Sequence, residues 1–475
     1  MINKKYKSTF LFYDYETFGI SPSKDRPVQF ASIRTNNKFE IIEKPNILYC
    51  YPNTDYLPNL ESILITGITP KKAQDFGIIE SRFAFKIYNI FNVFNTCIIG
   101  FNNIKFDDEF TRYLFYRNLL DPYTWSWKNK NSRWDVLKIM HALYALRPNG
   151  IYWPYYYNGF PDFKLHSLAK ANNIKIINPH NAIYDVLTTI KIIRLAYIKQ
   201  PIFFKYLYKI RNKEQIKNLI DIKNMIPLVY VPEIFNKKKI AYLIVPIAWH
   251  PKNNNILIIV FLHKKIKNIN NLLFNLLNNF FLKNKHKFKN YSYSINFIYI
   301  NKCPILAPIN ILRLEDYNRL NIDKKNCLYN LENLKKKYNS IKNLINYFSN
   351  KKIIVSYKDK NVDYQLYNNF FNSYDRKMMN KIIITDPKNI SLLNIKFYDY
   401  RLPELLFKYR ARNFPNTLNI KEKSYWINYK KNIFNFKVIN NFFKKIKLNI
   451  NFYKNNKKKL KIIKEVFDYI NYLIK

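Results

Sequence analysis

Short apolar runs and polar residues succeed one another through the first part of the chain, a pattern typical of strands set among helices. Apolar runs predict strands over Thr9–Asp14, Gln29–Arg34, Phe39–Tyr49 and Cys97–Asn102. Apolar residues three or four positions apart predict helices over Asp108–Leu120, Trp134–Leu146, Leu165–Asn172 and Ala182–Ile198. Three early strands followed by strands and helices in alternation indicate a mixed α/β sheet layered with helices.

The pattern changes after about residue 200, where glycine disappears and Lys and Asn runs thicken. Short β-rich runs at Leu228–Val231, Ala241–Pro246 and Ile256–Phe261 predict a small, mostly β module with inserted helices. The rest of the chain predicts helices. A length of 475 residues suffices for about three domains. We therefore expect domains over residues 1–200, 201–350 and 351–475.

The formal net charge of +48, from 80 Lys and Arg against 32 Asp and Glu, indicates a polyanionic partner such as nucleic acid. However, Lys, Asn, Ile, Tyr and Phe dominate the whole chain, as expected where A/T-rich codons are favoured. A generic lysine-rich surface is therefore an equal alternative, and charge alone does not decide between the two.

Cysteine usage and hydropathy exclude several classes of protein. The four cysteines lie far apart without a CxxC pair, so neither a zinc site nor a dense disulfide framework is expected. Asp14 and Glu16 interrupt the first apolar run before a signal-peptide core is complete. Other apolar runs fall short of the roughly 20 residues that span a bilayer. We expect a cytoplasmic protein without a membrane segment.

Asp14 and Glu16 stand two positions apart at the end of the first apolar strand. Period two in a strand places both side chains on one face. Adjacent buried carboxylates raise each other's pKa, and a hard divalent cation such as Mg²⁺ or Mn²⁺ would neutralise them. Taken alone, such a pair is more often the exposed end of a surface strand.

Two further acids open helices. Asp107 follows an apolar strand in the sequence Asn103–Asp107, and His180 stands five residues before Asp185. Taken singly, Asp107 fits an acid favoured by a helix dipole, and His180 fits a structural histidine. In order, the three elements read D-x-E, N-x-x-F-D and H-x-A-x-x-D, at intervals of about 90 and about 75 residues.

This ordered set resembles the signature of the DEDDh exonucleases. The resemblance implies a ribonuclease H-like fold in which Asp14, Glu16, Asp107 and Asp185 hold two Mg²⁺ ions, with Mn²⁺ as a substitute. It implies that His180 is the general base, because an imidazole takes up a proton near neutral pH. The expected reaction is hydrolysis from a 3′ end with release of 5′-mononucleotides.

Further segments resemble the exodeoxyribonuclease I family within this group, and they lie in all three expected domains. These segments are Asp25–Phe30, Asn131–Asp135, Ala248–Pro251, Ile300–Pro304 and Tyr409–Pro415. The resemblance implies an SH3-like β-rich domain and a helical C-terminal domain after the nuclease domain. It also implies a positively charged groove and processive degradation of single-stranded DNA by a monomer in DNA repair and recombination.

The same resemblance implies two sets of contact residues. Substrate contacts are expected at Glu16, Phe18, Leu64, Thr66, Arg112, Tyr123, Trp127 and Lys164. A basic pocket for the acidic C-terminal tail of single-stranded DNA-binding protein is expected at Arg147, Arg313 and Lys335. Lys164 stands where the family more often carries arginine, and Ile226 replaces a lysine of the pocket.

Two alternatives stay open at the level of sequence. Related DEDDh enzymes act on RNA or short oligonucleotides. The sequence does not show which residues would distinguish RNA from DNA by contacting the 2′ position of the sugar. A protein that only coats single strands would also use lysines and aromatic rings. Four gathered carboxylates argue against that second role, because without metal they would repel the phosphates.

Overall fold

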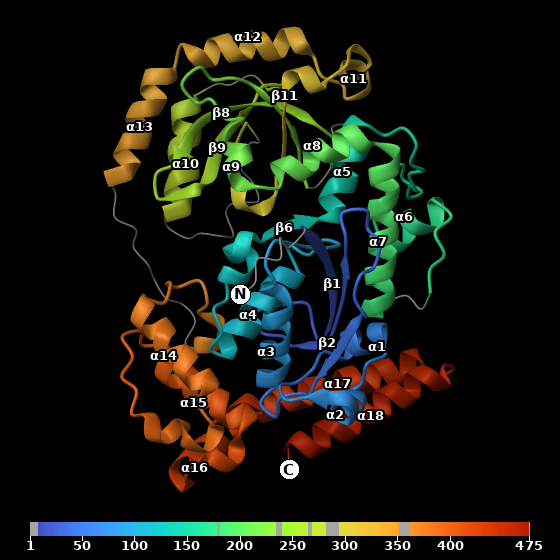
Figure 1. Ribbon diagram of the computed structural model, residues 1–475, viewed down its shortest axis with the longest axis vertical. Helices are drawn as coiled ribbons and strands as arrows, with labels where there is room; N and C mark the ends of the chain where they lie inside the picture. Colours follow the sequence, from blue (N-terminus) through green and yellow to red (C-terminus); the bar gives the residue numbers. More distant parts are fainter. Residues whose placement is uncertain are drawn as a thin grey trace, which may run out of the picture. The chain divides into compact units, whose positions relative to one another are not determined.

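The computed structural model describes residues 8–177, 181–233, 240–264, 268–281, 294–350 and 361–474 (Figure 1). The chain forms two compact units. The first comprises Met1–Arg133, Ile176–Ile190 and Tyr357–Lys475, and the second comprises Trp134–Lys175 and Lys191–Ser356. The domain limits at residues 200 and 350 stay a prediction.

A six-stranded sheet with the order β4-β3-β2-β1-β5-β6 forms the centre of the first unit. Its strands are β1 (Thr9–Thr17), β2 (Pro27–Thr35), β3 (Asn46–Cys50), β4 (Gly77–Ile78), β5 (Thr96–Gly100) and β6 (Ser132–Asp135). β1 pairs antiparallel with β2 and parallel with β5. Because β1 and β5 run in the same direction, the residues that follow both strands emerge at the same edge of the sheet.

Helices from both ends of the sequence surround this sheet. They are α1 (Leu60–Thr66), α2 (Pro70–Phe76), α3 (Glu80–Phe91), α4 (Asp107–Arg117), α14 (Ser373–Ile384), α15 (Leu402–Asn413), α16 (Ile420–Ile433), α17 (Phe436–Phe452) and α18 (Lys457–Ile474). α18 packs against α1 and α2 (Figure 1). Val466 and Ile470 of α18 share a buried cluster with Ile63 and Val28. The C-terminal helices therefore complete the core beside the six-stranded sheet.

The second unit contains a five-stranded sheet with the order β10-β9-β8-β7-β11, all of it antiparallel. Its strands are β7 (Leu228–Val231), β8 (Tyr242–His250), β9 (Asn253–Phe261), β10 (Ile295–Tyr299) and β11 (Ile305–Pro308). Its helices are α5 (Val136–Leu146), α6 (Leu165–Ala171), α8 (Pro201–Ile210), α9 (Lys213–Lys217), α10 (Ile269–Phe281), α11 (Leu314–Arg319), α12 (Lys324–Lys335) and α13 (Tyr338–Asn350). Helix α7 (Ala182–Lys199) begins in the first unit. Among the described residues, no helix is long and apolar enough to cross a membrane.

Local backbone geometry moved two of the predicted boundaries. The strand predicted from Phe39 begins only at Asn46, because Phe39 adopts a left-handed conformation with φ 63° and turns the chain. The helix predicted from Trp134 begins at Val136, because Trp134 and Asp135 still belong to β6. Asp135 caps the helix by accepting the Leu137 N–H at 3.0 Å.

Candidate active site

Three of the predicted metal ligands gather beside the end of β1. Carboxylate oxygens of Asp14, Glu16 and Asp185 lie within 4.8 Å of one another. Asp14 and Glu16 project from the same face of β1, and Asp185 lies in the first turn of α7. Glu16 is 8 % exposed, whereas Asp14 and Asp185 are half-buried, so the cluster opens toward solvent on one side.

Asp107 reaches the same strand from the first turn of α4. Its side chain is 3 % exposed, and its Oδ1 accepts the Tyr15 N–H at 3.2 Å. Tyr15 separates Asp14 from Glu16, so this hydrogen bond holds the Asp107 carboxylate against the acidic strand. Asp107 is not one of the three residues within the 4.8 Å group.

The gathered acids disfavour one another's ionised forms. Burial first, and then the charges of Asp107, Glu16 and Asp185, raise the pKa of Asp14 well above its ordinary value. Burial and the charge of Asp185 raise the pKa of Glu16 from 4.5 to about 8. A site whose carboxylates repel one another is suited to a divalent cation, because the cation would favour the ionised forms of both Asp14 and Glu16. The cluster is therefore a candidate site for a divalent metal.

A second buried carboxylate anchors the start of α4. Asp108 is fully buried and accepts hydrogen bonds from the Tyr13 hydroxyl, the Arg133 guanidinium and, at 3.1 Å, the Asn103 amide. The Asp108 N–H in turn donates to the Asn103 carbonyl at 2.8 Å. These contacts fix the first turn of α4 behind β1 and thereby orient Asp107. The sequence offered only one hint of this anchoring role of Asp108, which is that a second acid follows Asp107 directly.

Replacing Tyr13 with phenylalanine is expected to lower the free energy of unfolding by about 1.5 to 3 kcal/mol, because a buried carboxylate loses one donor. Urea denaturation measures this change. Tyr472→Phe is the matched control, because Tyr472 is 59 % exposed and its loss should change stability by less than about 0.5 kcal/mol. Equal effects of the two substitutions would contradict the role assigned to Asp108.

His180, predicted as the general base, lies outside the described residues. Its neighbour along the chain, the α7 turn with Asp185, is described and lies at the acidic cluster. The role of His180 stays a prediction.

Comparison with known proteins places the chain in a family. Three family models match successive segments: Exonuclease over residues 11–193, Exonuclease I SH3-like domain over 211–350 and Exonuclease I C-terminal domain over 360–473. Exodeoxyribonuclease I of Escherichia coli (strain K12) is 41% identical over 476 residues, and the match covers 100% of both chains. The chain belongs to the exodeoxyribonuclease I family.

Solved structures from the exodeoxyribonuclease I family have the same fold. A crystal structure of E. coli exonuclease I in complex with a dA16 oligonucleotide matches with a TM-score of 0.90 and 41% identity, over 98% of this chain and 100% of that one. A crystal structure of SSB/exonuclease I in complex with the inhibitor CFAM matches with a TM-score of 0.89 and 41% identity, over 98% and 100% of the two chains. The predicted enzyme class and the predicted fold, an exonuclease domain with an SH3-like domain and a helical C-terminal domain, are confirmed.

Two residues expected to contact substrate in this family, Arg112 and Tyr123, lie together in the first unit. The Arg112 guanidinium lies 5.7 Å from the centre of the Tyr123 ring. It donates to Glu109 at 2.7 Å and to the Tyr367 hydroxyl at 3.1 Å. Sequence reasoning missed both Glu109 and Tyr367. Tyr367 carried no signal, because it is one of many aromatic residues and lies 255 residues from Arg112 along the chain.

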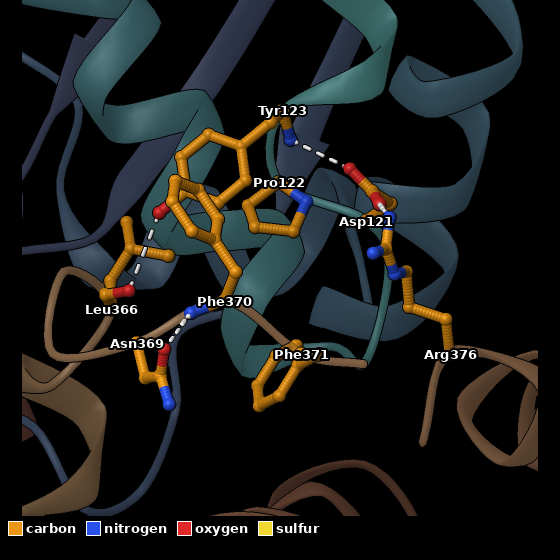
Figure 2. A pocket seen from close by; sticks show the side chains of 8 residues that line it. All are labelled: Asp121, Pro122, Tyr123, Leu366, Asn369, Phe370, Phe371 and Arg376. Atoms are coloured by element: carbon orange, nitrogen blue, oxygen red, sulfur yellow. Dashed lines mark hydrogen bonds and ion pairs between the residues drawn. The ribbon is translucent and has the colours of Figure 1, made fainter. Parts of the chain in front are cut away.

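Tyr123 also forms one wall of a small hollow (Figure 2). The hollow has a volume of about 80 Å³, and Asp121, Pro122, Tyr123, Leu366, Asn369, Phe370, Phe371 and Arg376 line it. The Tyr123 hydroxyl donates to the Leu366 carbonyl at 3.3 Å, and the Tyr123 and Phe370 ring centres lie 5.2 Å apart. Phe370 is 72 % exposed, so this aromatic pair reaches the surface.

The remaining predicted substrate contacts differ in exposure. Phe18 and Leu64 are buried, and Thr66 is half-buried at the end of α1. Trp127 is 64 % exposed, as a ring that stacks on a base requires. Lys164 is exposed at the N-cap of α6. Trp127 and Lys164 are therefore surface groups, whereas Phe18 and Leu64 belong to a buried hydrophobic cluster.

Two of the three residues predicted to bind the protein tail converge in the second unit. Arg147 lies 3.6 Å from the carboxylate of Asp316, and Arg313 lies 3.1 Å from it. Arg319, which sequence reasoning missed, is the third arginine of this set. Its guanidinium lies 2.8 Å from the Asp316 carboxylate. Burial alone would raise the pKa of Asp316, but hydrogen bonds from Arg313 and Arg319 lower it to about 2. Lys335 is exposed in the last turn of α12.

Proposed function

We propose that the chain degrades single-stranded DNA from its 3′ end and releases 5′-mononucleotides. The observation that carries this proposal is the half-buried cluster of Asp14, Glu16 and Asp185 within a segment matched by the exonuclease family. The full-length likeness to an enzyme whose solved structure contains a dA16 oligonucleotide supports DNA as the substrate.

We infer that the cluster holds two Mg²⁺ ions and accepts Mn²⁺ in their place. Carboxylate oxygens are the ligands that these hard cations prefer, and Asp107 supplies a fourth carboxylate beside Asp14. When bound, such a pair activates a water and stabilises the leaving 3′ oxygen. Asp14, Glu16, Asp107 and Asp185 would hold and orient the ions, and His180 would take a proton from the attacking water.

Metal binding to this site should strengthen as pH rises toward 8. Glu16 must lose its proton to bind a cation, and its pKa is raised to about 8, so protons compete with metal below that pH. In the metal-free protein, the raised pKa of Glu16 makes the fold less stable as pH rises from 4.5 to about 8, because the unfolded chain loses this proton more readily than the folded protein. Mg²⁺ should therefore raise the melting temperature more at about pH 8 than at about pH 6.

Thermal unfolding with Mg²⁺ and with EDTA at both pH values measures this difference. Glu16→Gln is the informative variant, because a neutral side chain cannot compete for a proton in this range. It should bind metal more weakly and lose part of the pH dependence, because Asp14, whose pKa is also raised, still binds a proton in competition with metal. An Mg²⁺ effect that is the same at both pH values in the unaltered protein would refute the assignment.

The strand is held by cations and exposed rings, without base-specific contacts. Arg112 and Lys164 contact phosphates, and Tyr123 and Trp127 stack on bases, while Phe18, Leu64 and Thr66 surround the 3′-terminal nucleotide. Such contacts tolerate any sequence, so the enzyme can advance by many nucleotides per encounter. This processive action fits a role in DNA repair and recombination.

We propose that the arginine cluster around Asp316 binds the acidic C-terminal tail of single-stranded DNA-binding protein. Three guanidinium groups, from Arg147, Arg313 and Arg319, face the buried carboxylate of Asp316, and Arg313 also pairs with Glu315 at 2.7 Å. Three cations against two acids leave an excess of positive charge for an acidic peptide. Lys335 adds a further exposed cation. The solved SSB/exonuclease I structure supports this partner. We further propose that the chain acts as a monomer in the cytoplasm, where its four cysteines stay reduced.

A gel time course with 3′-labelled and 5′-labelled single-stranded DNA tests the proposed function. We expect the 3′ label to be released at once as mononucleotide, with Mg²⁺ and not with EDTA. The 5′-labelled strand should pass from full length to short products with little accumulation of intermediate lengths, as processive action requires. Matched duplex DNA and RNA should be degraded much more slowly. Faster degradation of RNA would assign the chain to another substrate class, and tight binding without cleavage in Mg²⁺ would make it a binding protein.

A further inference from the structure

A hairpin at residues 152–163 carries exposed tyrosine rings that the proposed chemistry does not use. Tyr152 is 73 % exposed, Tyr155 is 57 % exposed and Tyr157 is fully exposed. Single exposed rings are common on protein surfaces, but several within six residues expose a large apolar area to water, and such patches mark binding surfaces.

The backbone of the hairpin is well defined by hydrogen bonds. The Tyr156 N–H donates to the Phe160 carbonyl at 2.8 Å, and the Asp162 N–H donates to the Pro154 carbonyl at 2.8 Å. Gly159, with φ +77°, closes the turn in the left-handed conformation that three-residue hairpin loops require. A ligand would therefore meet rings on an ordered backbone, which lowers the entropy lost on binding.

An aromatic cluster anchors the base of the hairpin. The Trp153 ring centre lies 5.2 Å from that of Tyr144 and 6.1 Å from that of Phe163. The Trp153 indole N–H donates to the Pro148 carbonyl at 2.9 Å. Trp153 thus fixes the hairpin to the second unit, while the tyrosines on either side of it remain exposed.

The charge around these rings favours a polyanion. Residues 150–177 contain three lysines, Lys164, Lys170 and Lys175, and a single acid, Asp162. Asp162 is engaged locally, because it accepts the Ser167 hydroxyl at 2.6 Å and the Lys164 N–H at 3.0 Å. The Lys164 ammonium lies 5.6 Å from the centre of the Tyr156 ring. Glu233, which borders the hairpin, is paired with Lys138 at 2.5 Å. Exposed rings beside lysines are the combination that binds bases and phosphates of a single strand.

One side of the hairpin borders an open hollow of about 350 Å³. His141, Tyr156, Asn158, Phe160, Pro161, Phe163 and Glu233 line it. A nucleobase is a flat ring system similar in size to a tyrosine ring, so the hollow has room for one. Its walls combine aromatic faces with the polar side chains of Asn158 and His141, which suits a base with polar edges.

We propose that the hairpin at residues 152–163 binds unpaired nucleobases of single-stranded DNA, with Tyr155 and Tyr157 stacking on bases and Lys164 contacting the adjacent phosphate. The proposal rests on the proposed function and adds a stacking surface in a different part of the chain from Arg112 and Tyr123.

The test compares the unaltered protein with the double variant Tyr155→Ala, Tyr157→Ala. Fluorescence anisotropy with a labelled oligo(dT) in EDTA measures affinity without cleavage. Stacking on one aromatic side chain is worth about 1 to 3 kcal/mol, so we expect at least about tenfold weaker binding. The pair Tyr155→Phe, Tyr157→Phe keeps both rings and should retain full affinity. Tyr472→Ala removes a similarly exposed tyrosine, at 59 %, and should have no effect.

Oligonucleotides with one abasic position identify the bases that are stacked. The unaltered protein should lose affinity when the abasic position meets the hairpin, and the alanine variant should be insensitive to it. Equal DNA affinity of the alanine variant and the unaltered protein would overturn the proposal. The exposed rings would then be candidates for contact with a protein partner. Loss of 3′ end degradation by the unaltered protein would instead refute the proposed function, so the two failures are distinguishable.

Discussion

Replacing Asp14 with alanine is expected to lower the rate of nucleotide release by at least about a thousandfold while DNA binding is retained. Asp14 is the acid whose pKa is raised by burial and by all three other carboxylates, so it is central to the cluster. Its loss should remove cation binding, which contributes several kcal/mol to the transition state, and each 1.36 kcal/mol is a factor of ten in rate.

DNA binding should be unchanged or stronger in Asp14→Ala, because one negative charge facing the phosphates is removed. Single-turnover release of a 3′-labelled nucleotide gives the rate, and anisotropy in EDTA gives the affinity. Asp75→Ala is the matched control, because Asp75 is an exposed acid of α2 outside the cluster, and it should keep the full rate. A rate within tenfold of the unaltered protein would show that the active site lies elsewhere.

Replacing Arg412 with alanine is expected to lower the free energy of unfolding by about 3 to 5 kcal/mol, because two buried carboxylates lose their partner. The Arg412 guanidinium donates to Asp55 at 2.8 Å and to Asp363 at 3.1 Å, and all three side chains are at most 2 % exposed. Arg26, at 3.7 Å, and Lys408, at 4.0 Å, also face Asp363. Asp55 belongs to the nuclease segment and Arg412 to α15, so this network ties the C-terminal helices to the nuclease domain.

The effect of Arg412→Ala should depend on pH. Burial alone would raise the pKa of Asp363, but the charge and hydrogen bonds of Arg412, then Lys408 and Arg26, hold it well below 3.8. An acid whose pKa is lower in the folded protein than in the unfolded chain stabilises the fold at a pH above its unfolded-state pKa. This stabilisation is lost as pH falls toward the folded-state pKa. The variant should therefore begin to unfold at a higher pH than the unaltered protein when both are acidified.

Urea denaturation at neutral pH and an acid titration measure both effects of Arg412→Ala. Arg376→Ala is the matched control, because Arg376 is 48 % exposed and pairs with Asp121 at 3.7 Å. An exposed pair of this kind contributes about 1 kcal/mol or less. If Arg412→Ala costs no more than Arg376→Ala, the buried network does not hold the C-terminal helices in place.

Much of the site could be read from the sequence because its parts are local. The two-residue repeat of a strand places Asp14 and Glu16 on one face, and Asp185 opens a helix that the apolar spacing predicts. The order of the acids along the chain carried the family resemblance, which the full-length match to E. coli exodeoxyribonuclease I confirmed. The predicted strands and helices were found, with shifted boundaries such as those at Phe39 and Trp134, which depend on the φ of one residue or on one cap. The sequence analysis did not predict α1, α2 and α3.

What the sequence could not determine are contacts between residues far apart along the chain. The pairing of Arg112 with Tyr367 and that of Arg412 with Asp55 join segments separated by 255 and 357 residues. No local periodicity encodes such pairs, since they form only when the C-terminal segment packs against the N-terminal segment within the first unit. By itself the sequence determined the elements, the order of the acids and the reaction class they suit. The tertiary structure decided which charges are buried in pairs and which rings remain exposed, because burial depends on what the rest of the chain packs against each residue.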